Sequence, residues 1–532
     1  MDMLQQLRPT ELSVSQCESL EGMAVLTGLQ ILELRECNKL KNVDGLKNLT
    51  GLQTLILHGC SELQNLDGLK NLTSLQILEL RECNKLKNVD GLKNLTGLQS
   101  LILDGCSELQ NLDGLKNLTD LQTLVIKGSD RSQKAVLQNV DGLKALVGLQ
   151  KLVLIGCSEL KNLDGLQGLT GLRNLDLRGC AALQNAAPLK ALTRLQILNL
   201  SLCKELQNVD DLKGLTELQT LDLSRCSALQ NVDGLKELNG LQTLNLSYCP
   251  TLQNVDGLMG HAELKELHLH HCSKLKSVDG LMGLSGLKNF IFGSCAVLQN
   301  VDGMKGLTGL QTLDISDCPS LLNVDGLKGL SSLKKLDIRD CTMLQNVDGL
   351  KGLTELRTIY LERCSALQNV DGMKGLTGLK VLNLKECTSL QEAEGLKGLG
   401  SLQSLVFHKC SALLNVNALD GLTGLQELNI GDSPALQNVN VIKGLTGLKK
   451  LHLYRCTSLQ DVDCLKGLTD LQTLWLAECT ALRNVDGLKG ITGLQQLFLS
   501  GCYDIPAAAL RELRVALPKT DITFPTGAKN PQ

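Results

Sequence analysis

The sequence predicts an α/β-type repeat solenoid, in which one short strand and one tight turn recur along the chain. Three observations on its 532 residues support this: cysteines return every 23 residues, leucines alternate just ahead of each cysteine, and an Asp-Gly-Leu segment follows most of them. Hydrophobic residues make up 43% of the chain and aromatic residues only 2%, so the core must be aliphatic and mostly leucine. A unit of this size cannot bury its own leucines, so successive units must stack around one continuous core.

The cysteines define the period. Of 21 repeat slots, 19 carry cysteine, and Ser129 and Ser433 occupy the other two. The spacing is interrupted once, by five additional residues near 130–136. Cys17, in a shortened first turn, and Cys464 lie outside this series. The ladder cysteines are Cys37, Cys60, Cys83, Cys106, Cys157, Cys180, Cys203, Cys226, Cys249, Cys272, Cys295, Cys318, Cys341, Cys364, Cys387, Cys410, Cys456, Cys479 and Cys502.

One repeat, LQTLDLSRCSALQNVDGLKELNG (Leu218–Gly240), shows the pattern of each unit. If Leu218 is position one, leucines at positions four and six (Leu221 and Leu223) alternate with polar residues, which is typical of a short half-buried strand. The Asp-Gly pair at Asp233 is turn chemistry, and Leu235 begins a spacing that fits a single helical turn. Each unit is therefore predicted to be a strand, a loop and a tight, 3₁₀-like return.

The pattern LxxLxLxxCxxL resembles the leucine-rich repeat, in its form with cysteine at position nine. The segment NVDGLKGL (Asn346–Leu353) is similar to the short convex segment of internalin-like repeats. This resemblance covers about residues 12–502. It implies a leucine-rich-repeat horseshoe, with a concave parallel β-sheet, short 3₁₀ or turn segments on the convex side, and ligand binding on the concave face.

The repeats are expected to be capped at both ends, which predicts a whole solenoid without an appended catalytic or signalling domain. Residues 1–28 are predicted to form an N-terminal cap and a degenerate first turn, with an apolar face from Met3, Leu4 and Leu7. Residues 29–502 form about 21 repeats, and 503–522 a helical cap that Pro518 ends. Residues 523–532 are expected to be a disordered tail. The helical cap has its leucines at helical spacing, namely Leu510, Leu513 and Leu517.

The ladder position favours a structural role for its cysteines. It directly follows the strand, where the turning chain directs backbone polar groups inward and a small side chain with a weak S–H donor can bond one of them. The hydroxyls of Ser129 and Ser433 are expected to do the same. A metal chain or redox relay is the alternative, but no C-x-x-C motif occurs.

We expect free thiols and a cytoplasmic location. Neighbouring ladder positions should lie about 5 Å apart, within disulfide range, but their side chains point in parallel and pairing would distort every turn. Free thiols fit a reducing compartment. The first 16 residues also lack the basic and apolar regions of a secretory signal.

Composition and motifs exclude several function classes. With 53 basic and 56 acidic residues, the chain has no electrostatic footprint for nucleic acid. No apolar run reaches the roughly 18 residues of a membrane span. The chain has no dinucleotide-binding, phosphate-loop, nucleophile-elbow or zinc-protease motif. The sequence therefore predicts a protein that is not an enzyme, with no catalytic residue, no cofactor and no metal.

Positions five and seven of the repeat should face the concave side, and they vary while the frame stays nearly constant. Aromatic residues dominate binding hot spots, and several of the ten in this chain fall on these positions near the C-terminus. The alternative is that these rings pack against one another and the C-terminal cap. The candidate partner-binding residues are Tyr360, His408, His452, Tyr454, Trp475 and Phe498.

Two other groups of polar residues lie on the same face, and each could be either a chemical site or a simple polar contact surface. A histidine group near HLHHC could hold a metal, but it lacks a third strong ligand, which favours a polar contact patch. An acidic group could supply an acid/base pair, but on an open surface a solvated or partner-facing charge pattern is favoured. The histidines are His261, His268, His270 and His271, and the acidic residues are Asp176, Asp222, Asp314 and Asp337.

The sequence thus predicts a non-enzymatic scaffold that binds another protein on its concave surface. One alternative is a structural or self-assembling repeat protein, since long leucine-rich solenoids can stack on one another, and self-association stays open. Another is a binder of glycans or small ligands through the same aromatic residues. Neither nucleic acid binding nor membrane insertion is expected.

Overall fold

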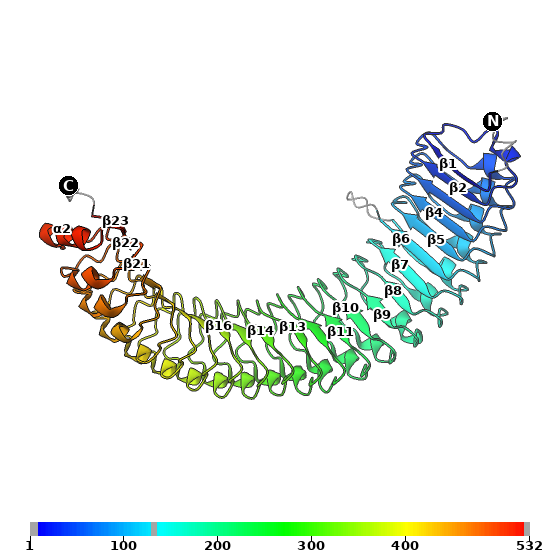
Figure 1. Cartoon of the computed structure of the whole chain (residues 1–532). Helices are drawn as coiled ribbons and strands as arrows, with labels where there is room; N and C mark the ends of the chain where they lie inside the picture. The colour runs from blue at the N-terminus through cyan, green and yellow to red at the C-terminus, as the bar shows by residue number, and fades with distance from the viewer. Residues whose placement is uncertain (1–8, 129–135, 526–532) are drawn as a thin grey trace. The chain divides into compact units, whose positions relative to one another are not determined.

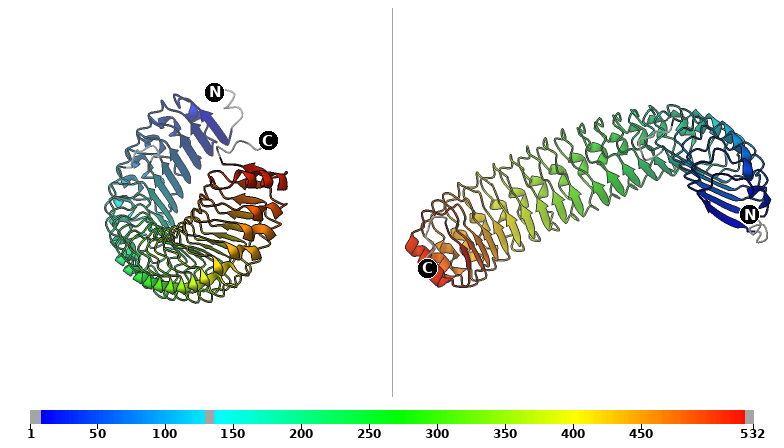
Figure 2. Two further views of the ribbon diagram at one scale, coloured as in Figure 1. Left: turned by 90° about the vertical axis from the view of Figure 1, so that its left-hand side faces the viewer. Right: turned by 90° about the horizontal axis from the view of Figure 1, so that it is seen from above.

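A computed structural model describes residues 9–128 and 136–525, in two compact units, Met1–His268 and Leu269–Gln532. Each unit is a stack of turns, and each turn contains one short strand, a loop and one 3₁₀ helix. Within each unit the strands line the inner side of the stack and the 3₁₀ helices line the outer side (Figures 1 and 2). We call these the strand face and the 3₁₀ face.

The described part of the first unit, residues 9–128 and 136–268, contains twelve strands that follow one another in chain order. They are parallel and in register, so that Leu221 pairs with Leu198 on one side and with Leu244 on the other. The strands are β1 Glu11–Ser15, β2 Ile31–Arg35, β3 Thr54–His58, β4 Ile77–Arg81, β5 Ser100–Asp104, β6 Thr123–Lys127, β7 Lys151–Ile155, β8 Asn174–Asp176, β9 Ile197–Asn199, β10 Thr220–Asp222, β11 Thr243–Asn245 and β12 Glu266–His268. The 3₁₀ helices are η1 Met23–Val25, η2 Asp44–Leu46, η3 Asp67–Leu69, η4 Asp90–Leu92, η5 Asp113–Leu115, η6 Asp141–Leu143, η7 Asp164–Leu166, η8 Ala187–Ala191, η9 Asp210–Leu212, η10 Asp233–Leu235 and η11 Asp256–Leu258.

The second unit repeats the design and ends in an α-helix and a last strand. Its strands are β13 Asn289–Ile291, β14 Thr312–Asp314, β15 Lys335–Asp337, β16 Thr358–Tyr360, β17 Val381–Asn383, β18 Ser404–Val406, β19 Glu427–Asn429, β20 Lys450–His452, β21 Thr473–Trp475, β22 Gln496–Phe498 and β23 Asp521–Thr523. Its helices are η12 Asp279–Leu281, η13 Asp302–Met304, η14 Asp325–Leu327, η15 Asp348–Leu350, η16 Asp371–Met373, η17 Glu394–Leu396, η18 Asn417–Leu419, η19 Asn440–Gly444, η20 Asp463–Gly467, η21 Asp486–Gly490 and α2 Ala507–Ala516. The strands from β14 to β23 form one parallel sheet in chain order.

The core of each unit is the aliphatic stack that the sequence predicts. In the repeat that contains β10, Leu221, Leu223 and Cys226 are all 0% exposed, as are Val232 and Leu235 on the 3₁₀ side. The equivalent residues of the neighbouring turns cover them, since no single turn has the area to do so. The predicted fold class, a parallel repeat solenoid with 3₁₀ returns, is confirmed.

The Asp-Gly-Leu segment forms or starts most of the 3₁₀ helices and also allows the turns to stack closely. The side chain of Asn231 accepts the backbone N–H of Asp233 at 3.2 Å, which fixes the entry to η10. A Cβ atom on Gly234 would overlap the carbonyl oxygen of Val209 in the preceding turn. Glycine is therefore required here by the approach of two backbones rather than by a left-handed φ.

The hydrogen-bond ladder of the second unit is interrupted between β13 and β14, which belong to separate sheets. From β15 to β22 the residue before each strand donates its N–H to the carbonyl of its counterpart one turn back, as Lys334 does to Gln311 at 2.8 Å. Among the described residues, Gln311 makes no such bond to Lys288, although Ser294 still donates to Ser316 at 2.7 Å. The turn on one side of the break carries phenylalanine at both core positions of its strand, Phe290 and Phe292.

These two phenylalanines account for the interruption. Their rings stack with centroids 5.3 Å apart, in slots that nearly all other turns fill with the smaller leucine or isoleucine. Overfilling a close-packed core forces backbone shifts. A single phenylalanine is tolerated, because Phe407 is fully buried at position six and β18 still pairs with β19. Both core positions must be enlarged together to open the ladder.

The C-terminal end carries helix α2, which the sequence predicts, and strand β23, which it does not. Helix α2 covers the end of the second unit (Figure 2), with Leu510, Leu513 and Leu517 buried beneath it. Beyond it, β23 pairs with β22 and reaches Thr523, so the ordered chain extends into the segment expected to be a disordered tail. Alternation around the buried Ile522 is too short a signal to distinguish from a loop.

Several predicted features lie outside the described residues, namely Met3, Leu4 and Leu7, Ser129 with the insertion up to residue 135, and the tail from residue 526. Within 9–128 and 136–525, no helix has the length and apolar character required to cross a membrane.

Candidate functional site

The strand face of the second unit brings together five of the six predicted partner-binding residues. His452, Trp475 and Phe498 occupy position five of three successive turns, and their strands β20, β21 and β22 pair in register. The rings stack along the sheet, with centroids 5.5 Å apart between His452 and Trp475 and 4.1 Å apart between Trp475 and Phe498. Each of the three side chains remains partly exposed.

His408 and Tyr454 form a second contact beside this stack, at position seven. The Tyr454 hydroxyl lies 2.9 Å from Nδ1 of His408, although the two residues are two turns apart. The intervening turn carries Gly431 at the same position, where a Cβ atom would lie 2.5 Å from Tyr454 Cε1. Gly431 thus leaves the space that the tyrosine ring fills, a role that the sequence alone did not reveal.

We name these five residues, His408, His452, Tyr454, Trp475 and Phe498, the C-terminal aromatic cluster. Their mutual packing was the alternative considered from sequence, and the structure shows it together with their partial exposure. Both faces of the Trp475 ring are covered, by His452 on one side and Phe498 on the other. The cluster therefore presents ring edges to the solvent.

Tyr360, the sixth candidate, lies apart from the cluster on β16. Its ring faces two cations, with Lys335 Nζ 5.5 Å and Arg339 Cζ 6.0 Å from the ring centroid. Such contacts contribute about 0.5–1 kcal/mol at exposed sites. Arg339 is also bonded to the buried carboxylate of Asp337 at 2.7 Å. Tyr360 therefore packs within a local charge network.

Burial sets the protonation of the cluster. It lowers the pKa of His452 below its ordinary value of 6.5, which favours the neutral ring against Trp475, although Glu427 acts in the opposite direction. Burial likewise raises the pKa of Tyr454, and Asp432 adds to this effect. At neutral pH both His452 and Tyr454 are therefore favoured in their uncharged forms.

A hollow of about 220 Å³ adjoins the cluster at His452, over strands β18 to β20. Its floor is apolar, with Val406 partly exposed, and Glu427 and Lys450 form an ion pair of 2.6 Å at its edge. The cluster and the hollow together form one continuous surface with an apolar centre and a charged rim. The lining residues are Ser404, Leu405, Val406, Glu427, Leu428, Asn429, Lys450 and His452.

The acidic group on the strand face has a structural role that its sequence pattern did not show. The side chain of Asp222 accepts the backbone N–H of Ser224 at 2.8 Å, and Asp314 accepts that of Ser316 at 2.8 Å. Asn245 makes the same bond to Ser247. Aspartate and asparagine at position five thus cap the chain where it leaves the strand, so part of the variation in this column serves the backbone.

The histidine group is not gathered into a metal site. His261 is fully buried in a slot where other turns carry leucine, and its ring nitrogens lie 2.9 and 3.0 Å from the carbonyl oxygens of Leu258 and Leu235. His268 is bonded to Glu266 at 2.9 Å. Over residues 9–128 and 136–525, no three His, Cys, Asp or Glu side chains converge to hold a metal.

The ladder cysteines satisfy backbone carbonyl groups. The thiol of Cys226 donates to the carbonyl of Leu200 at 3.2 Å, and that of Cys364 to Ile338 at 3.1 Å, in each case at position six of the preceding turn. Burial raises the pKa of Cys364 to about 12, so the protonated thiol that donates this bond persists at neutral pH. None of the 21 cysteines is joined in a disulfide.

The expectation for Ser433 is wrong. Its hydroxyl is fully buried but has no hydrogen-bond partner among the described residues. A C–O bond is shorter than a C–S bond, so the hydroxyl does not reach as far toward the carbonyl of the preceding turn as a thiol would. Serine fills the ladder space without forming the ladder bond.

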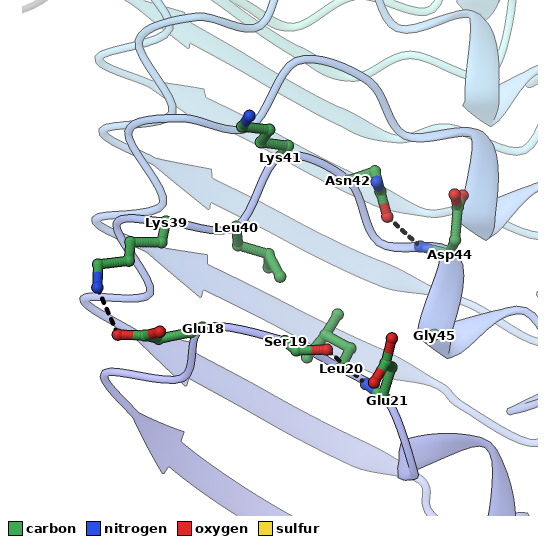
Figure 3. Close-up of a pocket in the computed structure, with 10 residues that line it drawn as sticks. All are labelled: Glu18, Ser19, Leu20, Glu21, Lys39, Leu40, Lys41, Asn42, Asp44 and Gly45. Carbon is green, nitrogen blue, oxygen red and sulfur yellow. Dashed lines mark hydrogen bonds and ion pairs between the residues drawn. The ribbon is translucent and has the colours of Figure 1, made fainter.

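A second hollow, of about 350 Å³, lies near the N-terminal end between the first two turns (Figure 3). Lys39 and Glu18 form an ion pair of 2.5 Å across it, and Asn42 accepts the N–H of Asp44 at 3.1 Å. It is polar and follows from the shortened first turn, which leaves less chain to fill this side. Of its polar side chains, Glu18 and Lys39 pair with each other, and Ser19 and Asn42 accept backbone N–H groups.

Comparison with known proteins identifies the repeat. The model of the BspA type leucine rich repeat region matches in six copies, over residues 16–132, 262–391 and 383–506. The sequence matches no curated protein.

The chain is also similar to three solved structures, each with a TM-score below 0.5. A leucine-rich-repeat protein of Leptospira interrogans is 18% identical, with a TM-score of 0.41, and 98% of each chain is covered. The plant peptide hormone receptor RGFR1, solved with RGF2, is 15% identical, with a TM-score of 0.44, over 97% of this chain and 95% of that one. TLR13, solved with ssRNA13, is 17% identical, with a TM-score of 0.37, over 94% and 92%. Because the family model covers more than half of the sequence, the chain belongs to the BspA-type leucine-rich repeat family.

Proposed function

We propose that this chain is a non-enzymatic scaffold that binds another protein on its strand face, with the C-terminal aromatic cluster at the centre of the contact. The observation that carries this proposal is the partly exposed Trp475, held between His452 and Phe498 beside an apolar hollow. Tryptophan and tyrosine are enriched in binding hot spots that a polar rim surrounds. The ion pair between Glu427 and Lys450 supplies such a rim.

The rigidity of the cluster supports binding. Stacked rings and the Tyr454–His408 hydrogen bond hold these side chains in place before a partner arrives. Ordering a mobile side chain on binding costs about 0.5–1.5 kcal/mol, so a fixed cluster avoids most of this cost. Leucine-rich repeats are typical of protein-binding domains, which is consistent with the proposal.

The geometry favours a protein partner over a glycan. A sugar that stacks on tryptophan requires a free ring face, and both faces of Trp475 are covered. Ring edges next to a hollow of about 220 Å³ suit an apolar side chain of a partner instead. The reducing cytoplasm is the proposed location, supported by a sequence with 21 cysteines and no disulfide among them.

The test is affinity capture from extract of the producing cells. Wild type is compared with a triple variant, Tyr454→Ser, Trp475→Ser and Phe498→Ser, and with Tyr503→Ser, which removes an aromatic side chain that is 67% exposed outside the cluster. We expect a protein that wild type and Tyr503→Ser retain and the folded triple variant loses. If wild type and both variants retain the same partners, the binding site lies elsewhere on the chain. Large assemblies of the pure chain in light scattering, with no partner, would instead support a self-assembling protein.

A further inference from the structure

The first two turns contain a cysteine pair whose sulfur atoms face each other. Cys17 and Cys37 each lie two residues beyond the paired residues Ser15 and Arg35 of β1 and β2. Adjacent strands are about 4.8 Å apart, which lies within the Cα separations that disulfides span. The Cys17 and Cys37 Sγ atoms are 2.6 Å apart, and the Cys17 N–H also points at Cys37 Sγ, at 3.3 Å.

The thiols of this pair do not make the bond to a position-six carbonyl that most ladder thiols make. Most interior thiols donate to the position-six carbonyl one turn back, as Cys226 does to Leu200 at 3.2 Å, whereas Cys83 and Cys318 donate to a carbonyl of their own turn. For Cys17 no described strand precedes β1, so no described carbonyl occupies that place. Cys37 has only the more distant carbonyl of Arg35, at 3.5 Å, in addition to the sulfur of Cys17.

The pair is also reachable. Cys17 is partly exposed, whereas every ladder cysteine, including Cys37, is buried. The next residue, Glu18, lines the open hollow between the first two turns (Figure 3), so solvent reaches the chain directly after Cys17. One exposed thiol in contact with one buried thiol is the arrangement of an attacking and a resolving cysteine.

We propose that Cys17 and Cys37 form a reversible disulfide by exchange with a small disulfide such as oxidised glutathione. The thiolate of Cys17 attacks one sulfur of the small disulfide, forms a mixed disulfide and releases one glutathione thiolate. Cys37 then loses its proton to water and attacks the Cys17 sulfur, which displaces the second glutathione. Two protein thiols are oxidised and one glutathione disulfide is reduced to two thiols. The new bond joins β1 to β2 across 20 residues of sequence.

The local chemistry assigns these two roles. Burial, together with the hydrogen bond from Cys17, raises the pKa of Cys37 to about 12. Cys37 is therefore a poor first nucleophile, and it reacts only because Cys17 already presents a disulfide sulfur in contact with it. The second step should accelerate as the pH rises, since a larger fraction of Cys37 is then ionised.

The test equilibrates the full chain with glutathione buffers from reduced to oxidised, quenches with acid, and counts free thiols by alkylation in denaturant. We expect a plateau two thiols below the 21 of the reduced chain, with one cross-linked peptide that contains Cys17 and Cys37. Cys37→Ser should stop at a glutathione adduct on Cys17, and Cys17→Ser should form neither product. Cys341 and Cys364, an interior pair, serve as the control and should stay reduced.

Three results would overturn the proposal. The first is 21 free thiols at every buffer ratio. The second is a lasting glutathione adduct on Cys17 of the wild-type chain while Cys37 stays reduced. The third is a cross-link that forms earlier elsewhere in the ladder. The wild-type measurement needs no variant to fold, so each outcome is informative by itself.

Discussion

The side-chain atom at the ladder position, sulfur or oxygen, determines whether a turn forms a hydrogen bond to the position-six carbonyl of the preceding turn. Cysteine reaches this carbonyl in turns such as that of Cys226, while the Ser433 hydroxyl is buried without a partner. An unsatisfied buried polar group costs about 1–3 kcal/mol.

Ser433→Cys should therefore stabilise the chain by about 1 kcal/mol, because it restores the missing bond. Urea denaturation measures the change, and Cys226→Ser is the matched reverse substitution, which should destabilise. A neutral or destabilising Ser433→Cys would show that the ladder thiol contributes no hydrogen bond of consequence.

Protonation of His452 should be visible in the fluorescence of Trp475, the only tryptophan of the chain. Burial lowers the pKa of His452 from its ordinary value of 6.5, so the unfolded chain binds its proton more readily than the folded chain. The stabilisation from the neutral ring is complete above pH 6.5 and is lost as the pH falls toward the folded-state pKa.

We expect a change in Trp475 emission between pH 8 and pH 5 with a midpoint below 6.5. His452→Gln should remove it, because glutamine does not titrate. A midpoint above 6.5, or a transition that persists in His452→Gln, would contradict this account of the stack.

At the scale of elements, the interrupted ladder between β13 and β14 follows from Phe290 and Phe292 acting together. The double variant Phe290→Leu, Phe292→Leu should let the strands pair, because leucine fits the slots that the other turns fill. Hydrogen exchange of the Gln311 amide should then slow at least about tenfold, which corresponds to an increase of about 1.4 kcal/mol in the free energy of local opening.

Phe407→Leu is the control for this experiment, since β18 and β19 already pair around that ring. It should leave amide exchange at its own ladder nearly unchanged. Unaltered exchange at Gln311 in the double variant would mean that ring size does not cause the interruption.

How far the elements could be predicted depends on how local their signals are. The strand and the 3₁₀ helix of each turn could be predicted from leucines such as Leu221 and Leu235, because every repeat carries the same pattern. Helix α2 could be predicted from the helical spacing of Leu510, Leu513 and Leu517. The break at β13 was not predicted, because phenylalanine also satisfies a hydrophobic pattern and only packing against the next turn reveals its excess volume. The short strand β23 carries no repeat signal.

The site was predictable in its members but not in its contacts. The repeat spacing correctly predicted that His452, Trp475 and Phe498, all at position five, are neighbours. It could not show that Gly431 lets Tyr454 reach His408 two turns away, since this depends on the path of one side chain. Nor could it show that Asp222 caps the backbone, which requires knowing where the strand ends.

At the scale of the whole molecule, the buried residues of the repeat build the scaffold. Leucines, ladder cysteines and glycines such as Gly234 hold neighbouring turns together, and many position-five polar residues cap the strands. The C-terminal aromatic cluster is the exception, because its rings stay partly exposed on a face that the fold does not require them to cover. This contrast is the physical basis for assigning it to recognition.

The most direct test of this assignment is a titration of the captured partner into the pure chain, followed by Trp475 fluorescence. We predict that binding shifts the emission of Trp475 and that the triple variant Tyr454→Ser, Trp475→Ser, Phe498→Ser raises Kd at least about tenfold by calorimetry, since hot-spot residues contribute more than about 1 kcal/mol each. Tyr503→Ser should leave Kd unchanged. An unshifted Trp475 emission together with equal Kd values for all three proteins would contradict the claim that the cluster binds the partner.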